Sequence, residues 1–227
     1  MIIFSVPLLI LYYWGSCKVV KLKKPIDYIN DLRSSPNIEI SKLGETLYER
    51  YCQWTRSLRL KDMLEFLRKI QDNREKIGIA QLFGKFRAYS FEEFVYRLIQ
   101  AEVEVPRTLG LYWGEKCLVW KESDKEYGIE IDILTGKKLN RFIEPVVAVD
   151  AKIELDASRL KTALASFLIL KRCNPNAKCF LVYMMGEVHP LLLELMEPWI
   201  DGIYQFSEEK DETVVFVKSV QAAVKQF

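Results

Sequence analysis

The chain has 227 residues, of which 50% are hydrophobic and 28% are charged, and its formal net charge is +2. This composition is that of a globular protein with one good core and a small appended region, and it excludes disordered and fibrous proteins. The small net charge excludes a protein that coats nucleic acid through its overall charge, so any nucleic-acid surface must be a local patch.

The apolar N-terminus comes first in the chain. Residues 1–14 are mostly apolar and are followed by the basic stretch 18–24. The run is shorter than the ~20 residues of a membrane span, and its positive charge follows the apolar part, whereas a signal peptide carries it in front. Two interpretations stay open: a buried element of the fold, which we favour, and a membrane-proximal anchor formed by residues 1–24.

Helical spacing dominates the next part of the chain. Leu43, Leu47, Tyr51 and Trp54 follow one helical face, and a second helix fits residues 60–70. We therefore expect a mostly helical N-terminal region over residues 1–85, without chemistry of its own, and a second domain over residues 86–227.

The segment Ser90-Phe91-Glu92-Glu93 predicts a helix start. Ser90 is placed to cap, and Glu93 lies three residues on, which completes a capping box. Glu92 then lies on the rim of the apolar face, beside whatever the helix packs against.

Three strand-like stretches follow, at residues 116–121, 127–134 and 145–152, with turns at 123–126 and from 135 onward. A helix from Asp156 or Ser158 to Lys171 and a buried strand over 179–184 come next. A helix over 190–199, a strand over 203–206 and a helix from Val214 to the C-terminus complete the prediction.

The most informative strand is Pro145–Lys152, in which a valine-rich apolar run ends in Asp150-Ala151-Lys152. Such a run is typical of a buried central strand. Because strand side chains alternate between faces, Asp150 and Lys152 point the same way, about 6.5–7 Å apart. A carboxylate and an ammonium at the end of a buried strand indicate a site, although taken alone they also fit a strand-end ion pair.

Other residue types limit the chemistry of such a site. The five cysteines are scattered without a Cys-x-x-Cys pair, which indicates free thiols in a reducing, cytoplasmic environment. His189 is the only histidine, so a histidine-rich metal site or a Ser-His-Asp triad has almost nothing to draw on. Any catalysis must use carboxylates and lysine.

Taken in order, a helix with Glu92, a strand with Asp132, a strand with Asp150-Ala151-Lys152, a helix and a strand resemble the PD-(D/E)XK nuclease superfamily. The first-helix segment looks like that of its Mrr-like and Holliday-junction-resolvase-like branches. The resemblance covers residues 89–183 and implies an α/β fold of restriction-endonuclease-like type: a mixed central sheet flanked by helices, in the order αβββαβ.

The resemblance implies a Mg²⁺-dependent deoxyribonuclease, an endonuclease, that hydrolyses phosphodiester bonds by metal-activated water, with Mn²⁺ as a substitute. Asp132, Asp150 and the Ala151 carbonyl would hold the metal, with Glu92 completing the set directly or through water. Lys152 would orient or activate the water, or stabilise the phosphorane charge. Glu130 is a further candidate ligand. DNA is the implied partner, and a homodimer is expected by analogy with superfamily members that cut both strands.

Basic residues near these motifs are candidates for binding DNA phosphates. They are Lys137, Lys138 and Arg141, in the expected loop before the strand at residues 145–152, and Arg159 and Lys161 on the helix that follows this strand. A solvated surface explains them equally well.

The sequence departs from the superfamily pattern in two places. Ile131 stands where a proline is expected, and no glutamine motif follows Lys152. The proline does no chemistry, and the missing glutamine motif bears on the branch of the superfamily. The alternative function is a catalytically inactive nuclease-fold protein that binds nucleic acid or assembles with other chains.

Overall fold

A computed structural model describes residues 24–186 and 188–226 of the chain, so the apolar N-terminal run falls outside the described residues. Five helices precede the sheet: α1 (Pro25–Arg33), α2 (Ile38–Ser57), α3 (Leu60–Asp72), α4 (Arg74–Ile77) and α5 (Ala80–Glu102). The rest consists of β1 (Gly110–Glu122), β2 (Lys125–Leu139), β3 (Phe142–Leu155), α6 (Ala157–Cys173), β4 (Lys178–Gly186), α7 (Pro190–Met196), the short 3₁₀ helix η1 (Glu197–Trp199), β5 (Gly202–Gln205) and α8 (Thr213–Val224).

The sheet has five strands in the order β1-β2-β3-β4-β5. β1, β2 and β3 are antiparallel neighbours, whereas β3, β4 and β5 run parallel. A parallel pair needs a crossover connection, and α6 supplies it between β3 and β4. The predicted α/β class and the order helix, three strands, helix, strand are therefore confirmed.

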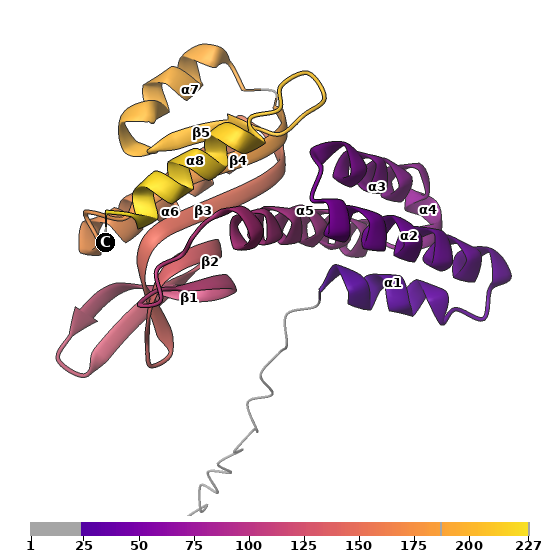
Figure 1. Ribbon diagram of the computed structural model, residues 1–227, viewed down its shortest axis with the longest axis horizontal. Coiled ribbons are helices and arrows are strands. Elements are labelled where there is room, and N and C mark those ends of the chain that lie inside the picture. Colours follow the sequence, from indigo (N-terminus) through magenta and orange to yellow (C-terminus); the bar gives the residue numbers. More distant parts are fainter. Residues whose placement is uncertain (1–23, 187, 227) are drawn as a thin grey trace, which may run out of the picture.

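Helices cover both faces of this sheet (Figure 1). α5 and α8 pack on one face, where Val147, Val149 and Val182 join their hydrophobic core. α6 packs on the other face against Ala148 and Leu181. Because β3 is buried on both faces, its apolar run needs no polar residue until Asp150.

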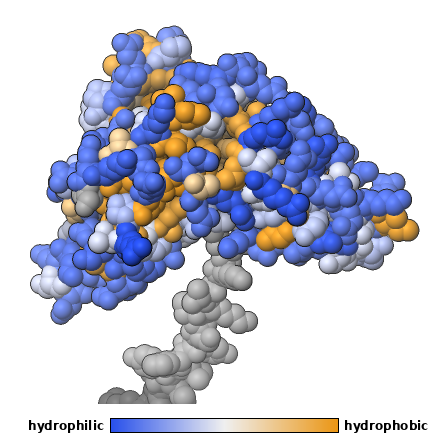
Figure 2. Space-filling model, in the orientation of Figure 1, coloured by the Kyte–Doolittle hydropathy of each residue, from blue (hydrophilic) through white to orange (hydrophobic). Residues whose placement is uncertain are grey.

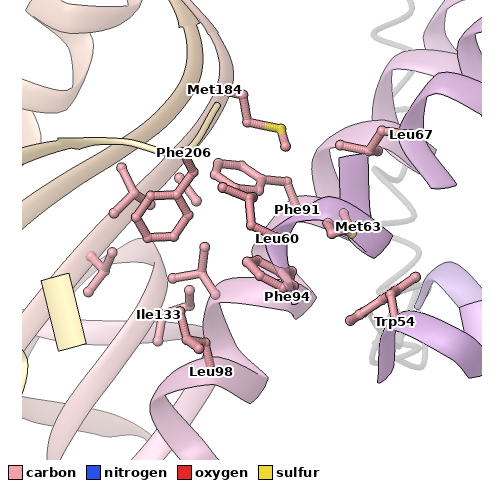
Figure 3. Close-up of a cluster of buried hydrophobic side chains, with 14 of the residues drawn as sticks. Trp54, Leu60, Met63, Leu67, Phe91, Phe94, Leu98, Ile133, Met184 and Phe206 are labelled. Atoms are coloured by element: carbon pink, nitrogen blue, oxygen red, sulfur yellow. The ribbon is translucent and has the colours of Figure 1, made fainter. Parts of the chain in front are cut away.

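Helices α1 to α4 form a helical arm that packs on α5, to one side of the sheet (Figure 1). Trp54, Phe66 and Phe94 are fully buried in the shared core. In Figure 3 the Phe91 and Phe94 side chains lie between Phe206 and Ile133 on the sheet side and Trp54 and Met63 on the arm side. The boundary expected after residue 85 falls inside α5, which is common to the arm and the sheet.

The predicted helix start at Ser90 is wrong. α5 already begins at Ala80, and the Ser90 hydroxyl donates a 2.7 Å hydrogen bond to the Phe86 carbonyl, as Ser does within a helix. Glu93 is therefore no capping residue. It is buried and accepts a 2.8 Å hydrogen bond from the Tyr51 hydroxyl of α2, together with an ion pair from Arg97.

The loop expected from residue 135 onward is also wrong, because β2 continues to Leu139. The β2–β3 register shifts between Thr135 and Gly136. A Cβ atom on Gly136 would lie 2.1 Å from the Glu144 carbonyl oxygen, so glycine allows the two backbones this approach. The turn is at Asn140, whose φ is 50°.

No helix within the described residues has the length and hydropathy needed to cross a membrane.

Candidate active site

The site lies where β2 and β3 separate. Their backbone ladder ends at the pair Ile133 and Val149, one residue before Asp132 and Asp150. Beyond this pair, the Asp132 side chain takes over from the ladder: its Oδ2 accepts a 2.9 Å hydrogen bond from the Ala151 N–H. The parting of two strands therefore brings two aspartates side by side.

Lys152 joins these aspartates from the same strand as Asp150. Its Nζ lies 3.1 Å from Asp132 Oδ2 and also makes a close ion pair with Asp150 Oδ1. The Lys152 and Asp132 side chains keep 26% and 25% of their surface, whereas Asp150 keeps 11%. The ammonium thus bridges two carboxylates at a partly open position.

Glu92 enters the site from α5, on the face of the sheet that α5 covers. Its Oε2 accepts a 2.9 Å hydrogen bond from the Trp113 indole N–H of β1. The Trp113 ring in turn stacks on Tyr96, one helical turn beyond Glu92, with centroids 6.0 Å apart. Glu92 is therefore held from β1 while its helix is held by packing.

Burial and charge repulsion raise the pKa values of two acids of this site, Glu92 and Asp150. Burial, followed by the negative charge of Asp132, raises the pKa of Glu92 to about 8. The same two causes raise the pKa of Asp150 to about 7, although Lys152 opposes them. Burial acts to lower the pKa of Lys152, but Asp132 and Asp150 outweigh it and raise that pKa, so Lys152 stays an ammonium. The site therefore holds three acids against a single ammonium.

The donor chemistry suits a hard divalent cation, because Mg²⁺ prefers carboxylate and carbonyl oxygens. The side chains are not arranged as a ready metal site. Within residues 24–186 and 188–226, no group of three or more His, Cys, Asp or Glu side chains is placed to hold a metal ion. Lys152 lies between the two aspartates instead. Cation and ammonium would therefore compete for Asp132 and Asp150. The Ala151 carbonyl remains a predicted ligand, and Glu130 is exposed on β2.

Only part of the predicted basic surface lies near this site. Lys137 and Lys138 are five and six residues along β2 from Asp132, about 17–20 Å away. Lys138 contacts Glu115 at 3.4 Å, and Arg141 faces Glu126 at 3.9 Å. Arg159, near the start of α6, contacts Glu154 at 3.7 Å, two residues after Lys152. Lys161 is exposed on the same helix.

Two residues of the site region escaped the sequence interpretation. Trp113 packs against the core and also donates a hydrogen bond to Glu92. Arg87 had no expected role, yet it contacts Glu154 at 3.2 Å. In the sequence Arg87 stands out only by preceding Glu92 by five residues. On one helix this spacing places Arg87 more than one turn from Glu92.

Comparisons with known proteins agree with the fold. No family model and no curated protein matches the chain. Among solved structures, the chain is similar to one described as the native BbvCI A2B2 tetramer at low resolution, with 13% identity and a TM-score of 0.56. The match covers 88% of this chain and 96% of that chain. BbvCI is a restriction endonuclease. At this identity the likeness shows the fold alone: the chain has a restriction-endonuclease-like α/β fold.

Proposed function

We propose that this protein is a Mg²⁺-dependent deoxyribonuclease, an endonuclease, and that Glu92, Asp132, Asp150 and Lys152 form its active centre. The observation that carries the proposal is the meeting of Asp132, Asp150 and Lys152 where the β2–β3 ladder opens, with Glu92 near enough for the charge of Asp132 to raise its pKa. The similarity to BbvCI in fold supports the same class of activity.

In this proposal Asp132, Asp150 and the Ala151 carbonyl hold Mg²⁺, and Glu92 joins them directly or through water. When bound, the metal would activate a water, whose proton passes to bulk solvent, and would neutralise charge on the attacked phosphate. Lys152 remains protonated and so cannot accept the proton of the attacking water. Its Nζ hydrogen-bonds the phosphate oxygens and stabilises their charge as the phosphorane forms. The Trp113 indole N–H holds the Oε2 atom of Glu92.

The proposal is tested with DNA of several forms in the presence of Mg²⁺, Mn²⁺ or a chelator. Asp150→Asn and Lys152→Ala should each lose at least about 100-fold in cleavage rate, as expected for groups that stabilise transition-state charge. Circular dichroism and melting should show an intact fold. Lys138→Ala is the matched control, because Lys138 lies on β2 beside Glu115. Metal-dependent cleavage at the wild-type rate by both site variants would refute the proposal.

One observation favours the alternative of a catalytically inactive nuclease-fold protein. The Lys152 ammonium already bridges the aspartates that would bind the metal. If calorimetry detects no Mg²⁺ or Mn²⁺ binding while DNA binding is retained, this alternative replaces the first.

A further inference from the structure

A groove opens beside the candidate active site, between the helical arm and the ends of β3 and β4. It has a volume of about 410 Å³, within the range of about 300–1,000 Å³ for small-ligand pockets. Its lining is of two kinds. The apolar part consists of Leu64, Leu67, Ile153, Met184 and Met185, and the polar part of Arg68, Gln71, Arg87 and Glu154.

The groove adjoins the site because both use β3. Glu154 lines the groove and follows Lys152 by two residues, about 7 Å along the strand. Met184 and Met185 come from the neighbouring segment of β4, where Glu154 pairs with Met185. Figure 3 shows Met184 extending from the sheet toward the arm that carries Leu67, and Figure 2 shows hydrophobic surface at this junction.

Two arginines share one carboxylate at the edge of this groove. Arg87 contacts Glu154 at 3.2 Å, and Arg159 contacts it at 3.7 Å. The Arg87 side chain is only 15% exposed and its guanidinium lies over the Phe83 ring at 5.4 Å, so it is held in place. Glu154 is 48% exposed. Arg87 is therefore the buried cation of this cluster, and Glu154 is its exposed counter-charge.

We propose that this groove holds an unpaired nucleotide of the substrate strand, next to the phosphate that is cut. Its phosphate would take the place of Glu154 beside Arg87 and Arg159, and its base would lie on the methionine and leucine side chains. A guanidinium binds a phosphate through charge-assisted hydrogen bonds, and methionine packs adaptably against flat surfaces. A blunt duplex matches the groove poorly, because its bases are stacked inside.

This inference rests on the proposed function, and it specifies the DNA: a strand that is single-stranded, or that leaves a duplex as an extension, at the cleavage site. It also separates the basic residues near the site from those along β2. Arg87 and Arg159 contact this nucleotide, whereas Lys138, farther along β2, does not line the groove.

Binding is measured by fluorescence anisotropy with the full chain in a chelator, so that cleavage does not interfere. The probes are a labelled single strand, a duplex with a single-stranded extension and a blunt duplex of the same sequence. The variants are Arg87→Met, which keeps an apolar stem over Phe83, and Glu154→Gln, which removes the counter-charge. Lys225→Met is the control, because Lys225 is exposed just after α8, where Gln221 contacts Glu104 beyond the C-terminal end of α5, 17 residues from Arg87.

The single strand and the extended duplex should bind more tightly than the blunt duplex. Arg87→Met should weaken their binding about tenfold and reduce the slope of log affinity against log salt by about 1. Glu154→Gln should tighten binding, an effect opposite in sign to that of a lost structural ion pair. Lys225→Met should leave the affinity for all three probes unchanged.

Equal binding of blunt and extended DNA, equal affinities of Arg87→Met and Lys225→Met, or weaker binding by Glu154→Gln would overturn the inference. The cleavage assay is independent of these results. A wild-type protein that binds DNA as expected but never cleaves it would contradict the proposed nuclease activity and still support the nucleotide-binding groove. Cleavage without the expected binding pattern would support the nuclease activity and contradict the groove.

Discussion

Replacing Lys152 by Met should make metal binding tighter while it abolishes cleavage. The reason is the position of the ammonium, 3.1 Å from Asp132 Oδ2 and in contact with Asp150. A divalent cation must use the same carboxylates. Removing the ammonium therefore removes a competitor, and the methionine retains most of the apolar stem of lysine.

The size of the gain follows from the ion pair. At 3.1 Å and an effective dielectric constant of about 20, the Lys152–Asp132 attraction amounts to about 5 kcal/mol. Partial exposure of both side chains reduces this figure, and in the variant Asp150 and Glu92 hold their protons more tightly, so that the cation must displace them. We expect a net gain of at least about tenfold in affinity, equal to about 1.4 kcal/mol.

Isothermal titration with Mn²⁺ measures this gain. It is best done above the pKa of Glu92, about 8, so that proton displacement is small. Lys138→Met, which removes an ammonium 3.4 Å from Glu115, should leave the affinity unchanged. Equal or weaker binding by Lys152→Met would show that the ammonium and the metal do not compete, and would refute the assignment of the two aspartates as shared ligands.

Three further predictions concern the surroundings of the site. Because the pKa values of Glu92 and Asp150 are raised from 4.5 and 3.8 to about 8 and about 7, the metal-free folded state binds more protons than the unfolded state. Its melting temperature should therefore fall as the pH rises through these pKa values, and Glu92→Gln should make this fall smaller. A melting temperature that rises over the same pH range would contradict the raised pKa values. Tyr51→Phe removes the hydroxyl that binds buried Glu93 and should cost about 1–3 kcal/mol in urea unfolding, and a cost near zero would refute the bond's role. Trp113→Phe keeps an aromatic ring beside Tyr96 but loses the N–H donor to Glu92, so metal affinity or cleavage should drop about 10- to 100-fold. The control Trp120→Phe, at an exposed position, should behave like the wild type.

Local patterns were sufficient for the strand that carries the site. Val146 to Val149 form a short valine-rich run after Pro145, and such a run has few alternatives to a buried strand. The positions of Asp150 and Lys152 at its end follow directly from the alternation of side chains. The predicted order of helices and strands around it is confirmed, because the hydrophobic spacing within each of these segments is also a local pattern.

Features that depend on distant parts of the chain were not predictable in this way. The pattern from Ser90 to Glu93 fits a capping box, but packing of the helical arm extends α5 back through Gly84 to Ala80. Gly136 suggested a turn, yet it serves the close approach of β3. Trp113 reaches Glu92 across 21 residues of sequence, so that only the folded arrangement of β1 and α5 brings them together.

A structure determined with Mn²⁺ is the decisive measurement for the assigned metal ligands, because anomalous scattering locates the metal without reference to activity. We expect an anomalous peak between Asp132 and Asp150, with Glu92 in its coordination sphere or linked to it by water, and with the Lys152 ammonium displaced from its position between the aspartates. A structure with no peak there, in which Lys152 still bridges Asp132 and Asp150 at saturating Mn²⁺, would contradict it.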